Sequence, residues 1–581
     1  MNIKLKYTIE APYKDNLIRA RGIDNIPSFL NPTVDDLSAP GLLGAQECAQ
    51  AAELISSMAG CRAITIVDSD CDGYCASTIL LNYLSRIYPD WKIDYYIHSK
   101  KQHGLEDIVM DPQYNLDDYD LVFLPDAGSN DDEYFEQYAG TKFIILDHHI
   151  RSKETPIPSN AIIINNQMSE RYPNKSLSGA GVTWQFCRYL DGVFNTDYAG
   201  DFMDLAAVAI IGDVMDITTP ENRLIISEGL KQMSSGQYRN EFLKLLFDNA
   251  AFSLNGTLTP IGVAFYIVPM INSMCRMGNL GEKTRMFLAF SAPHTQVECH
   301  KRGVEKGTVI DVATESVREC TNSKARQKKM QTQMAELCEK QIIENDLMSN
   351  KILTIVLDED FDEMPSEMNG LTATKIANDY GHPTIIGRVN KDGFLRGSMR
   401  GLSTVDMPPL KEFFMSSGLF EYVEGHQLAA GVSIPVSKLD QFHEWANKEL
   451  SDVHMDSKTW FVDFEMPASH PDLKAVICSM DELSHYWGQG FSEALIAVNK
   501  IRVGRGDITV MGKNADTVKI MHNGVAYMFF KRTPEEVKAL TQYARAELTI
   551  VGTANLNVYY GRMTPQIFVN DYEIKDDTLG F

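Results

Sequence analysis

The stretch AITIVDSDCDG (63–73) decides the fold, because it joins an apolar run to three aspartates and a glycine. The β-branched residues of 63–67 predict a buried strand, and the pattern of residues 74–88 predicts the helix that follows it. Asp68 and Asp70 stand two residues apart where the strand ends, so their side chains can point the same way. The stretch therefore predicts a strand, a sharp turn that carries carboxylates, and a helix.

Four more short apolar runs follow this unit, and helical patterns separate them. They are IDYYI (93–97), LVFL (121–124), FIIL (143–146) and AIII (161–164). An apolar helix is expected over 201–211. Strands that alternate with helices predict an α/β fold, in which helices cover a parallel sheet.

Acidic and histidine residues stand at the carboxyl ends of these elements. Beyond the first stretch they are Asp126, Asp147-His148-His149 and Asp213. Open α/β sheets place their active sites at this edge, so side chains that are distant in sequence are expected to meet there. Carboxylates together with imidazoles suit Mn²⁺ or Mg²⁺ better than Zn²⁺. The mutual repulsion of so many carboxylates favours two divalent ions over one.

Each cluster alone has an ordinary explanation. A DxDxDG pattern is common in calcium loops and solvated turns, but an EF-hand needs a glutamate where this chain has Ile79. A lone Asp126 or Asp213 is usually a helix cap or a turn residue. Four clusters at matching ends of strands and helices make a shared metal site the better interpretation.

Length and composition restrict the rest. A chain of 581 residues is too long for one hydrophobic core. Its 54 Lys and Arg against 78 Asp and Glu give a net charge of −24, which opposes a polyanionic ligand unless positive charge is local, partly through bound metal. The ten scattered cysteines indicate reduced thiols. Without a signal peptide or a long apolar window, we expect a cytoplasmic protein with no membrane partner.

The pattern changes along the chain and predicts four domains. We expect an α/β catalytic domain, a helical region ending in one long helix over 323–346, a second and smaller α/β lobe, and a β-rich end with one helix. Six short strands at this end suit a small barrel such as an OB-fold. The expected domain ranges are 1–225, 226–350, 351–450 and 451–581.

Four short motifs carry a resemblance to a known superfamily. VDSDCDG (67–73), LPDAG (124–128), LDHH (146–149) and IIGDVMD (210–216) resemble, in this order, the motifs of the DHH phosphoesterases. Within that superfamily the chain resembles the RecJ family, from about residue 60 to the end. The further similar segments are GDVMDITTPENR (212–223), PMINSMCRMG (269–278), GLTATKIANDYGHP (370–383), RGSMRG (396–401), EGHQLAAG (424–431) and YWGQGFSEA (486–494).

The resemblance implies a function and a fold. RecJ-like proteins are exonucleases that degrade single-stranded DNA from 5′ to 3′ to mononucleotides in DNA repair and recombination. They join a DHH domain through a long helix to a DHHA1 domain, which an OB-fold follows. The resemblance implies two Mn²⁺ or Mg²⁺ ions, single-stranded DNA as substrate, and a single-strand-binding protein or helicase as a further partner. The source is expected to be a bacterium or a virus that infects one.

The resemblance also implies roles for individual residues. The expected metal ligands are Asp68, Asp70, Asp126, His148 and Asp213, with Asp126 and Asp213 as the bridges between two ions. His149 is expected to contact the scissile phosphate, while Asp72 and Asp147 orient the ligands. The residues expected to hold phosphate and DNA are Arg276, Arg326, Ser398, Arg400 and His426.

Some of these residues have ordinary alternatives, and the chain departs from the RecJ pattern in places. Arg326, within KARQKK, would otherwise belong to a solvated helix face, and His426 would be a surface histidine. Ile66 stands where RecJ proteins carry a histidine, so one metal site is expected to lack a ligand or to take water instead. The second lobe has Glu424 where that family has a glycine, and the segment before Arg276 lacks its usual glycine.

Two other functions compete with the exonuclease. The first is a DHH enzyme that hydrolyses short RNA or small nucleotides, such as a nanoRNase or a phosphodiesterase of adenosine bisphosphate or cyclic dinucleotides. Such enzymes usually end after the second lobe, whereas this chain continues. The second is a non-catalytic RecJ-like replication scaffold, which the retained acidic and histidine residues oppose. In the β-rich end, aromatic and basic residues are expected to stack bases and contact phosphates: Tyr527, Phe529, Tyr559, Tyr560, Lys531, Arg532 and Arg562.

Overall fold

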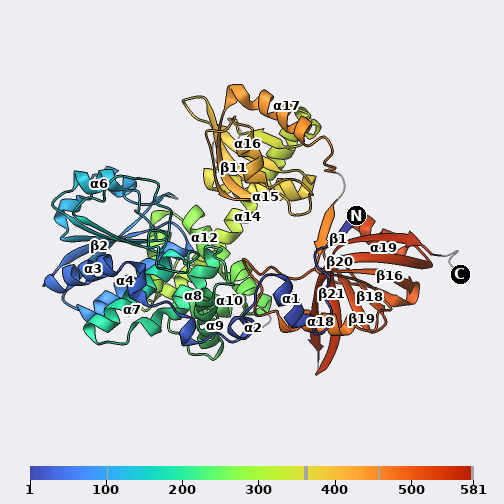
Figure 1. Cartoon of the computed structure of the whole chain (residues 1–581), viewed down its shortest axis with the longest axis horizontal. Coiled ribbons are helices and arrows are strands. Elements are labelled where there is room, and N and C mark those ends of the chain that lie inside the picture. Colours follow the sequence, from blue (N-terminus) through green and yellow to red (C-terminus); the bar gives the residue numbers. More distant parts are fainter. Residues whose placement is uncertain (101, 255, 359–363, 456–457, 560, 578–581) are drawn as a thin grey trace. The chain divides into compact units, whose positions relative to one another are not determined.

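The structure is a computed structural model that describes residues 1–577 except 101, 255, 359–363, 456–457 and 560. The chain divides into two compact units, and the boundary falls within the long helix α14 (Val312–Glu344). One unit comprises Arg21–Arg326 and His485–Ser492, and the other comprises Met1–Ala20, Gln327–Ser484 and Glu493–Phe581. Figure 1 shows the elements of both.

The first unit, which contains Arg21–Arg326, is built on a five-stranded parallel sheet. Its strand order is β3-β2-β4-β5-β6. All five strands predicted from the sequence are present, so the expected α/β fold is confirmed. Their bounds are β2 (Arg62–Val67), β3 (Lys92–Ile97), β4 (Leu121–Pro125), β5 (Lys142–Asp147) and β6 (Ala161–Asn165).

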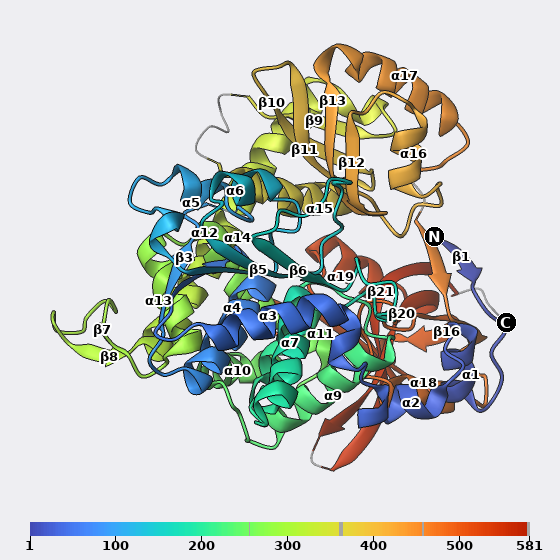
Figure 2. The ribbon, with the colours of Figure 1, turned by 60° about the vertical axis from the view of Figure 1, so that its left-hand side comes forward.

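Helices cover both faces of this sheet (Figure 2). On β2, Ala63 and Val67 pack into the core on one face, while Ile64 and Ile66 pack into the core on the other. The first face is covered by α3 (Ala45–Ser57), α4 (Cys71–Ile87) and α7 (Gly179–Phe194), and the second by α5 (Glu106–Met110) and α6 (Asp132–Gln137). Strands buried on both faces explain the apolar runs in the sequence.

The strand order reverses beside β2. The chain runs from β2 outward to β3, and then returns to the other side of β2 with β4, β5 and β6. Ligands of open α/β sheets bind at such a switch point, outside the carboxyl ends of the strands. The turn after β2 and the turn after β4 therefore flank the position where a site is expected.

Further helices of this unit contribute residues to the core of the first face. They include α8 (Met203–Gly212), α9 (Pro220–Ser234), α10 (Glu241–Leu254), α12 (Val268–Met277) and α13 (Leu280–Ser291), after which comes the hairpin β7 (Gln296–Glu298) and β8 (Val309–Asp311). Helix α14 begins earlier than the predicted helix over 323–346. Among the described residues, none of these helices is long and apolar enough to cross a membrane.

The second unit contains the smaller lobe that the sequence predicts. Its sheet has the order β12-β13-β11-β10-β9, with β9 and β10 parallel and the other pairs antiparallel. Phe414 and Phe442 lie in its core. The elements are β9 (Leu353–Val356), α15 (Asn369–Tyr380), β10 (Thr384–Val389), β11 (Phe394–Arg400), α16 (Leu410–Ser416), β12 (Tyr422–His426), β13 (Ala429–Pro435) and α17 (Leu439–Glu449).

The β-rich end forms one seven-stranded sheet of order β15-β16-β20-β21-β19-β18-β17. The described strands leave β15 and β17 as its edges, so their pairing does not close the sheet into the expected barrel. The elements are β15 (Phe464–Pro467), α18 (Leu473–Glu482), β16 (Ile496–Gly504), β17 (Ile508–Met511), β18 (Thr517–His522), β19 (Val525–Phe529), α19 (Pro534–Thr541), β20 (Arg545–Tyr559) and β21 (Arg562–Asp576).

The prediction that Tyr527 and Phe529 stack bases is wrong. Tyr527 and Phe529 are buried in the interior, 1% and 0% exposed. Arg532 lies over the ring of Phe529 and donates to the carbonyl oxygen of Val569, so it braces the sheet. Side chains alternate along a strand, and these two face inward. The side chains of Tyr559 and Tyr560 lie outside the described residues.

Candidate metal centre

The turn after β2 is shaped by Gly73. A Cβ atom at this position would lie 2.4 Å from the Cβ of Asp68, so only glycine allows the close approach. Asp70 caps α4, because its carboxylate accepts from the backbone N–H groups of Asp72 and Gly73 at 2.9 and 3.2 Å. The turn also rests on α12, where the side-chain oxygen of Asn272 accepts from the N–H of Cys71 at 2.9 Å.

Asp72 lies in the first turn of α4 and points toward the beginning of α7. Its two oxygens accept from the backbone N–H groups of Gly179 and Ala180 at 2.7 and 2.9 Å. These groups belong to the first turn of a helix, where unpaired N–H groups stabilise a negative charge. The carboxylate is thus fixed by backbone from two elements that are distant in sequence.

Asp126, directly after β4, has a strained backbone with φ of 70°. The side chain is buried, and its Oδ1 has no hydrogen-bond partner. A Cβ atom at Gly179 would lie 2.3 Å from this oxygen, so glycine at the start of α7 leaves the room that Asp126 occupies. A buried oxygen without a donor is costly, so this oxygen fits the role of a cation ligand.

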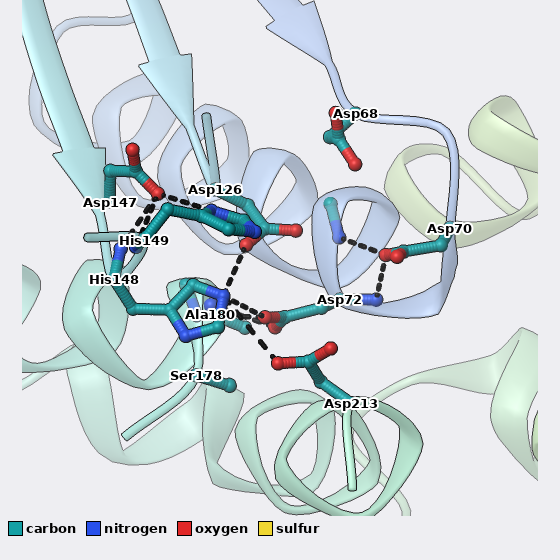
Figure 3. A network of polar contacts seen from close by, with 12 residues as sticks. Asp68, Asp70, Asp72, Asp126, Asp147, His148, His149, Ser178, Ala180 and Asp213 are labelled. Atoms are coloured by element: carbon teal, nitrogen blue, oxygen red, sulfur yellow. Dashed lines mark hydrogen bonds and ion pairs between the residues drawn. The ribbon is translucent and has the colours of Figure 1, made fainter. Parts of the chain in front are cut away.

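Asp213 follows α8, and the next residue, Val214, has a φ of 58°. Oδ2 of Asp213 is likewise buried without a hydrogen-bond partner. Nε2 of His148 lies 3.3 Å from Asp126 Oδ1, 3.5 Å from Asp213 Oδ2 and 3.9 Å from Asp72 Oδ2 (Figure 3). These separations are close to the roughly 3 Å expected between neighbouring ligands of one hard divalent ion with bonds of about 2.1 Å.

The side chains form three overlapping groups in which all ligand atoms lie within 4.8 Å of one another. The groups are Asp72, His148 and Asp213; Asp68, Asp70 and Asp126; and Asp126, His148 and His149. Asp126 and His148 each belong to two of them, and the carboxylate of Asp126, which has two oxygens, is the group that can lie between two ions. The structure therefore brings together the five expected metal ligands, Asp68, Asp70, Asp126, His148 and Asp213, and places Asp72 and His149 among them. Orphaned oxygens and an oxygen-rich donor set both fit divalent cations.

The electrostatics of these side chains agree with this fit. Burial and the charges of Asp72 and Asp70 raise the pKa of Asp213 to about 9. Burial and the charge of Asp72 also raise the pKa of Asp126 well above its usual range. Carboxylates that hold protons at neutral pH are typical of a cluster that needs cations to ionise.

Asp147 and His149 form a separate pair beside the cluster. Asp147 accepts from the N–H groups of Ser129 and His148 at 3.0 and 2.7 Å, and lies 2.8 Å from Nδ1 of His149. Burial opposes protonation of His149, but the hydrogen bond and charge of Asp147 outweigh it and raise the imidazole pKa to about 9. With its side chain 54% exposed, His149 is a cation that an anionic ligand can reach.

One neighbour of the cluster was missed by sequence reasoning. His103 follows β3 and contacts both carboxylate oxygens of Asp68, with Nδ1 2.7 Å from Oδ1 and 2.9 Å from Oδ2. No motif marks it, because KKQHG (100–104) has no regular pattern and stands after a strand that the motifs do not touch.

The residues expected to hold DNA are divided between the two units. Arg276 lies partly buried in the last turn of α12, and Arg326 pairs with Glu282 at 3.0 Å. Both belong to the unit with the acidic cluster. Ser398, Arg400 and His426 lie in the other unit.

Those three residues of the second lobe come together on adjacent strands. Arg400 on β11 pairs in register with Ala429 on β13, and Ala429 pairs with His426 on β12. Residues in register on neighbouring strands face the same side of a sheet, so Arg400 and His426 flank the small Ala429. Ser398 faces the same side two residues before Arg400, opposite Gly431. We call Ser398, Arg400 and His426 the second-lobe strip.

Comparison with known proteins gives consistent matches. Residues 63–210 match the model of the DHH family, N-terminal domain. The chain is 33% identical over 567 residues to a putative SPbeta prophage-derived single-strand DNA-specific exonuclease, YorK, of Bacillus subtilis, covering 96% of this chain and 95% of that protein. It is 22% identical over 509 residues to the single-stranded-DNA-specific exonuclease RecJ of Haemophilus influenzae, covering 83% and 82%.

A solved structure shares the fold. RecJ from Thermus thermophilus, in complex with Mn²⁺, superposes with a TM-score of 0.71 at 18% identity and covers 98% of this chain and 79% of that one. The structure of the same protein with Mg²⁺ gives a TM-score of 0.67 at 17% identity. At these identities the likeness shows the fold.

Proposed function

Because the chain belongs to the RecJ-like branch of the DHH family, we propose that it is a metal-dependent exonuclease that degrades single-stranded DNA. The observation that carries this proposal is the convergence of Asp126, Asp213 and His148, whose ligand atoms face one another with two buried oxygens unpaired. The names of the relatives, which are single-strand DNA-specific exonucleases, support the substrate.

We assign the ligands to two ions from the grouping of their atoms. Asp72, His148 and Asp213 would hold one ion, and Asp68 and Asp70 the other, with Asp126 between them. This assignment differs from the expectations that Asp72 only orients ligands and that Asp213 is a second bridge between the ions. Mn²⁺ and Mg²⁺, which are bound in RecJ from Thermus thermophilus, fit the donor set. When bound, such ions lower the pKa of water and stabilise charge on both attacking and leaving oxygens of a phosphodiester.

The protein's own groups supply the remaining functions. His149, protonated at neutral pH and held by Asp147, is placed to contact the scissile phosphate and to stabilise its developing charge. The backbone N–H groups at the start of α7 stabilise the negative charge of Asp72 and fix the direction of its carboxylate. The left-handed backbone conformations of Asp126 and Val214 set the orientation of the Asp126 and Asp213 carboxylates before substrate binds.

We propose that the second-lobe strip holds the DNA strand end. Its support is the register that places a guanidinium, a hydroxyl and an imidazole around the small residues Ala429 and Gly431, so a phosphate can approach the backbone. Arg276 and Arg326 are proposed as further phosphate contacts, Arg326 after leaving Glu282. We propose the β-rich end as an OB-fold-like strand-binding module, and polarity from 5′ to 3′.

Of the competing functions, hydrolysis of small nucleotides is opposed by the match of nearly the full chain to a single-strand DNA-specific exonuclease. A non-catalytic scaffold is opposed by the seven converging donors. We propose supply of the strand by a single-strand-binding protein or helicase as the wider context.

The test is digestion of 40-nucleotide single strands blocked at the 5′ or the 3′ end, with Mn²⁺, Mg²⁺ or a chelator. We expect mononucleotides from strands with a free 5′ end, and no product with chelator. Equal cleavage of both blocked strands would contradict an exonuclease. The same assay includes a dinucleotide as a second substrate, and faster hydrolysis of the dinucleotide than of the 40-nucleotide strands would favour the small-nucleotide function.

A further inference from the structure

The hydrogen bonds of the acidic cluster reveal one unusual member. Asp70 and Asp72 are each held by two backbone N–H groups. Asp147 is held by three, and by His149. Asp68 is 2% exposed and, among the described residues, has hydrogen bonds to one side chain alone, that of His103.

The contact between His103 and Asp68 is symmetrical. Nδ1 lies 2.7 Å from one oxygen and 2.9 Å from the other, so this nitrogen is nearly equidistant from the two carboxylate oxygens. A carboxylate only accepts, so Nδ1 carries the proton of this bond. Asp68 itself follows Ile66 and Val67, both buried in the cores, and neither offers a polar side chain.

Hydrogen bonds hold Ser99, Lys100 and Leu105, which lie on either side of His103 in the chain. Before it, the hydroxyl of Ser69 donates to the carbonyl oxygen of Lys100 at 3.1 Å, and Nζ of Lys283 donates to that of Ser99 at 2.8 Å. After it, the N–H of Leu105 donates to Asp131 at 2.9 Å. The segment therefore presents His103 at a set position rather than as a loose surface group.

Gly104 completes this turn. Its φ is +70°, and a Cβ atom there would lie 2.3 Å from Oδ2 of Asp131. Only glycine tolerates both the left-handed backbone and the close carboxylate. Leu105, which is fully buried, anchors the next position. A surface histidine without a structural role does not need a turn with these constraints. The turn is therefore consistent with a fixed position for His103.

Another acid and histidine group lacks these features. His300, Glu315 and Glu319 lie close enough for a metal. Glu319 pairs with Arg285 at 2.7 Å, and Glu315 with Arg318, so their charges are already balanced. This group is better explained as an ion-pair network.

We propose that His103 is a positioning residue of the metal centre, which holds the carboxylate of Asp68 in place for the ion shared with Asp70 and Asp126. Ile66 on β2 stands where a histidine was expected and has no imidazole. His103, in the segment after β3, provides an imidazole to the same site. The proposal rests on the two-ion site proposed above. Partners that orient a metal ligand typically change metal affinity by about 10- to 100-fold when they are removed.

The test measures Mn²⁺ binding by titration calorimetry to the full chain, without DNA. His103→Ala is expected to weaken one of two binding steps by about 10- to 100-fold and to leave the other unchanged. His103→Asn, whose amide nitrogen can take the place of Nδ1, is expected to restore most of the lost affinity. His294→Ala is the matched control, since His294 is an exposed histidine 3.3 Å from Asp311 in the same unit.

Thermal unfolding of each metal-free variant checks that the fold survives. His103→Ala that binds both ions as tightly as the wild type would overturn the proposal. His103→Asn that binds as weakly as His103→Ala would also overturn it, because the ring would then be needed as a direct ligand. Two bound ions without nuclease activity in the wild type would count against the proposed function and not against the role of His103.

Discussion

The acidic cluster at the edge of the parallel sheet and the second-lobe strip differ in how their side chains are held. In the cluster, Asp126 is buried in space left by Gly179, and one oxygen each of Asp126 and Asp213 has no hydrogen-bond partner. In the strip, His426 is exposed and Arg400 already donates to the carbonyl oxygen of Met399. The donor set of the cluster fits a divalent cation, while the strip is partly exposed at Ser398 and Arg400 and exposed at His426. Catalysis and strand binding should therefore respond separately to substitution.

The largest effect is expected from Asp126→Asn. The substitution removes a charge from the carboxylate shared by two groups, and loss of several kcal/mol of metal-based stabilisation corresponds to a fall in kcat of about 10³-fold or more. Single-turnover digestion of a labelled DNA strand measures it. A variant that keeps more than a tenth of the wild-type kcat would remove Asp126 from the metal centre.

Gly179→Ala should lower kcat nearly as much as Asp126→Asn, although it alters no charged group. The added Cβ would lie 2.3 Å from Asp126 Oδ1, so the carboxylate must move, and we expect kcat to fall by about 10²-fold. Gly192→Ala is the matched control on the same helix, because a Cβ there meets nothing within 4 Å. Equal activity of the two variants would show that the fit between Gly179 and Asp126 is not needed.

Mn²⁺ affinity should rise with pH. The pKa of Asp213 is raised to about 9 in the metal-free site, so this carboxyl is protonated at pH 7 and must lose its proton to bind a cation. Below its pKa the competing proton weakens binding, and we expect Kd to fall by about tenfold per pH unit between pH 7 and 8.5. Calorimetry in buffers of different ionisation enthalpy measures the proton release. Affinity independent of pH would contradict the raised pKa.

The smallest effect is expected from Arg400→Ala in the strip. Loss of a charge-assisted phosphate contact should raise KM for single-stranded DNA by about tenfold while kcat changes little. Lys375→Ala, on the exposed side of the same lobe and paired with Asp379, is the control. A fall in kcat with unchanged KM would place Arg400 in the chemistry and end the separation of the two regions.

Much of the cluster could be predicted because polar residues end apolar strands. The exits of β2, β4 and β5 and the end of α8 were all correctly placed. The division of labour between Asp70 and Asp72 could not be predicted, because it depends on where α4 begins. With Cys71 as its first residue, Asp70 becomes the cap and Asp72 turns toward α7.

Other features were hidden for different physical reasons. His103 depends on a turn set by Gly104 and Asp131, which local sequence does not reveal. The burial of Tyr527 and Phe529 depends on which alternate residues of β19 face inward, and an aromatic strand gives no polar contrast to decide it. Closure of the β-rich sheet depends on long-range pairing of its edges.

The most direct test of the central claim is an anomalous difference map from crystals of the full chain grown with Mn²⁺. We predict two peaks about 3.5 to 4 Å apart, with Asp126 between them, Asp72, His148 and Asp213 around one, and Asp68 and Asp70 around the other. A single peak, or peaks away from these side chains, would contradict the two-ion centre.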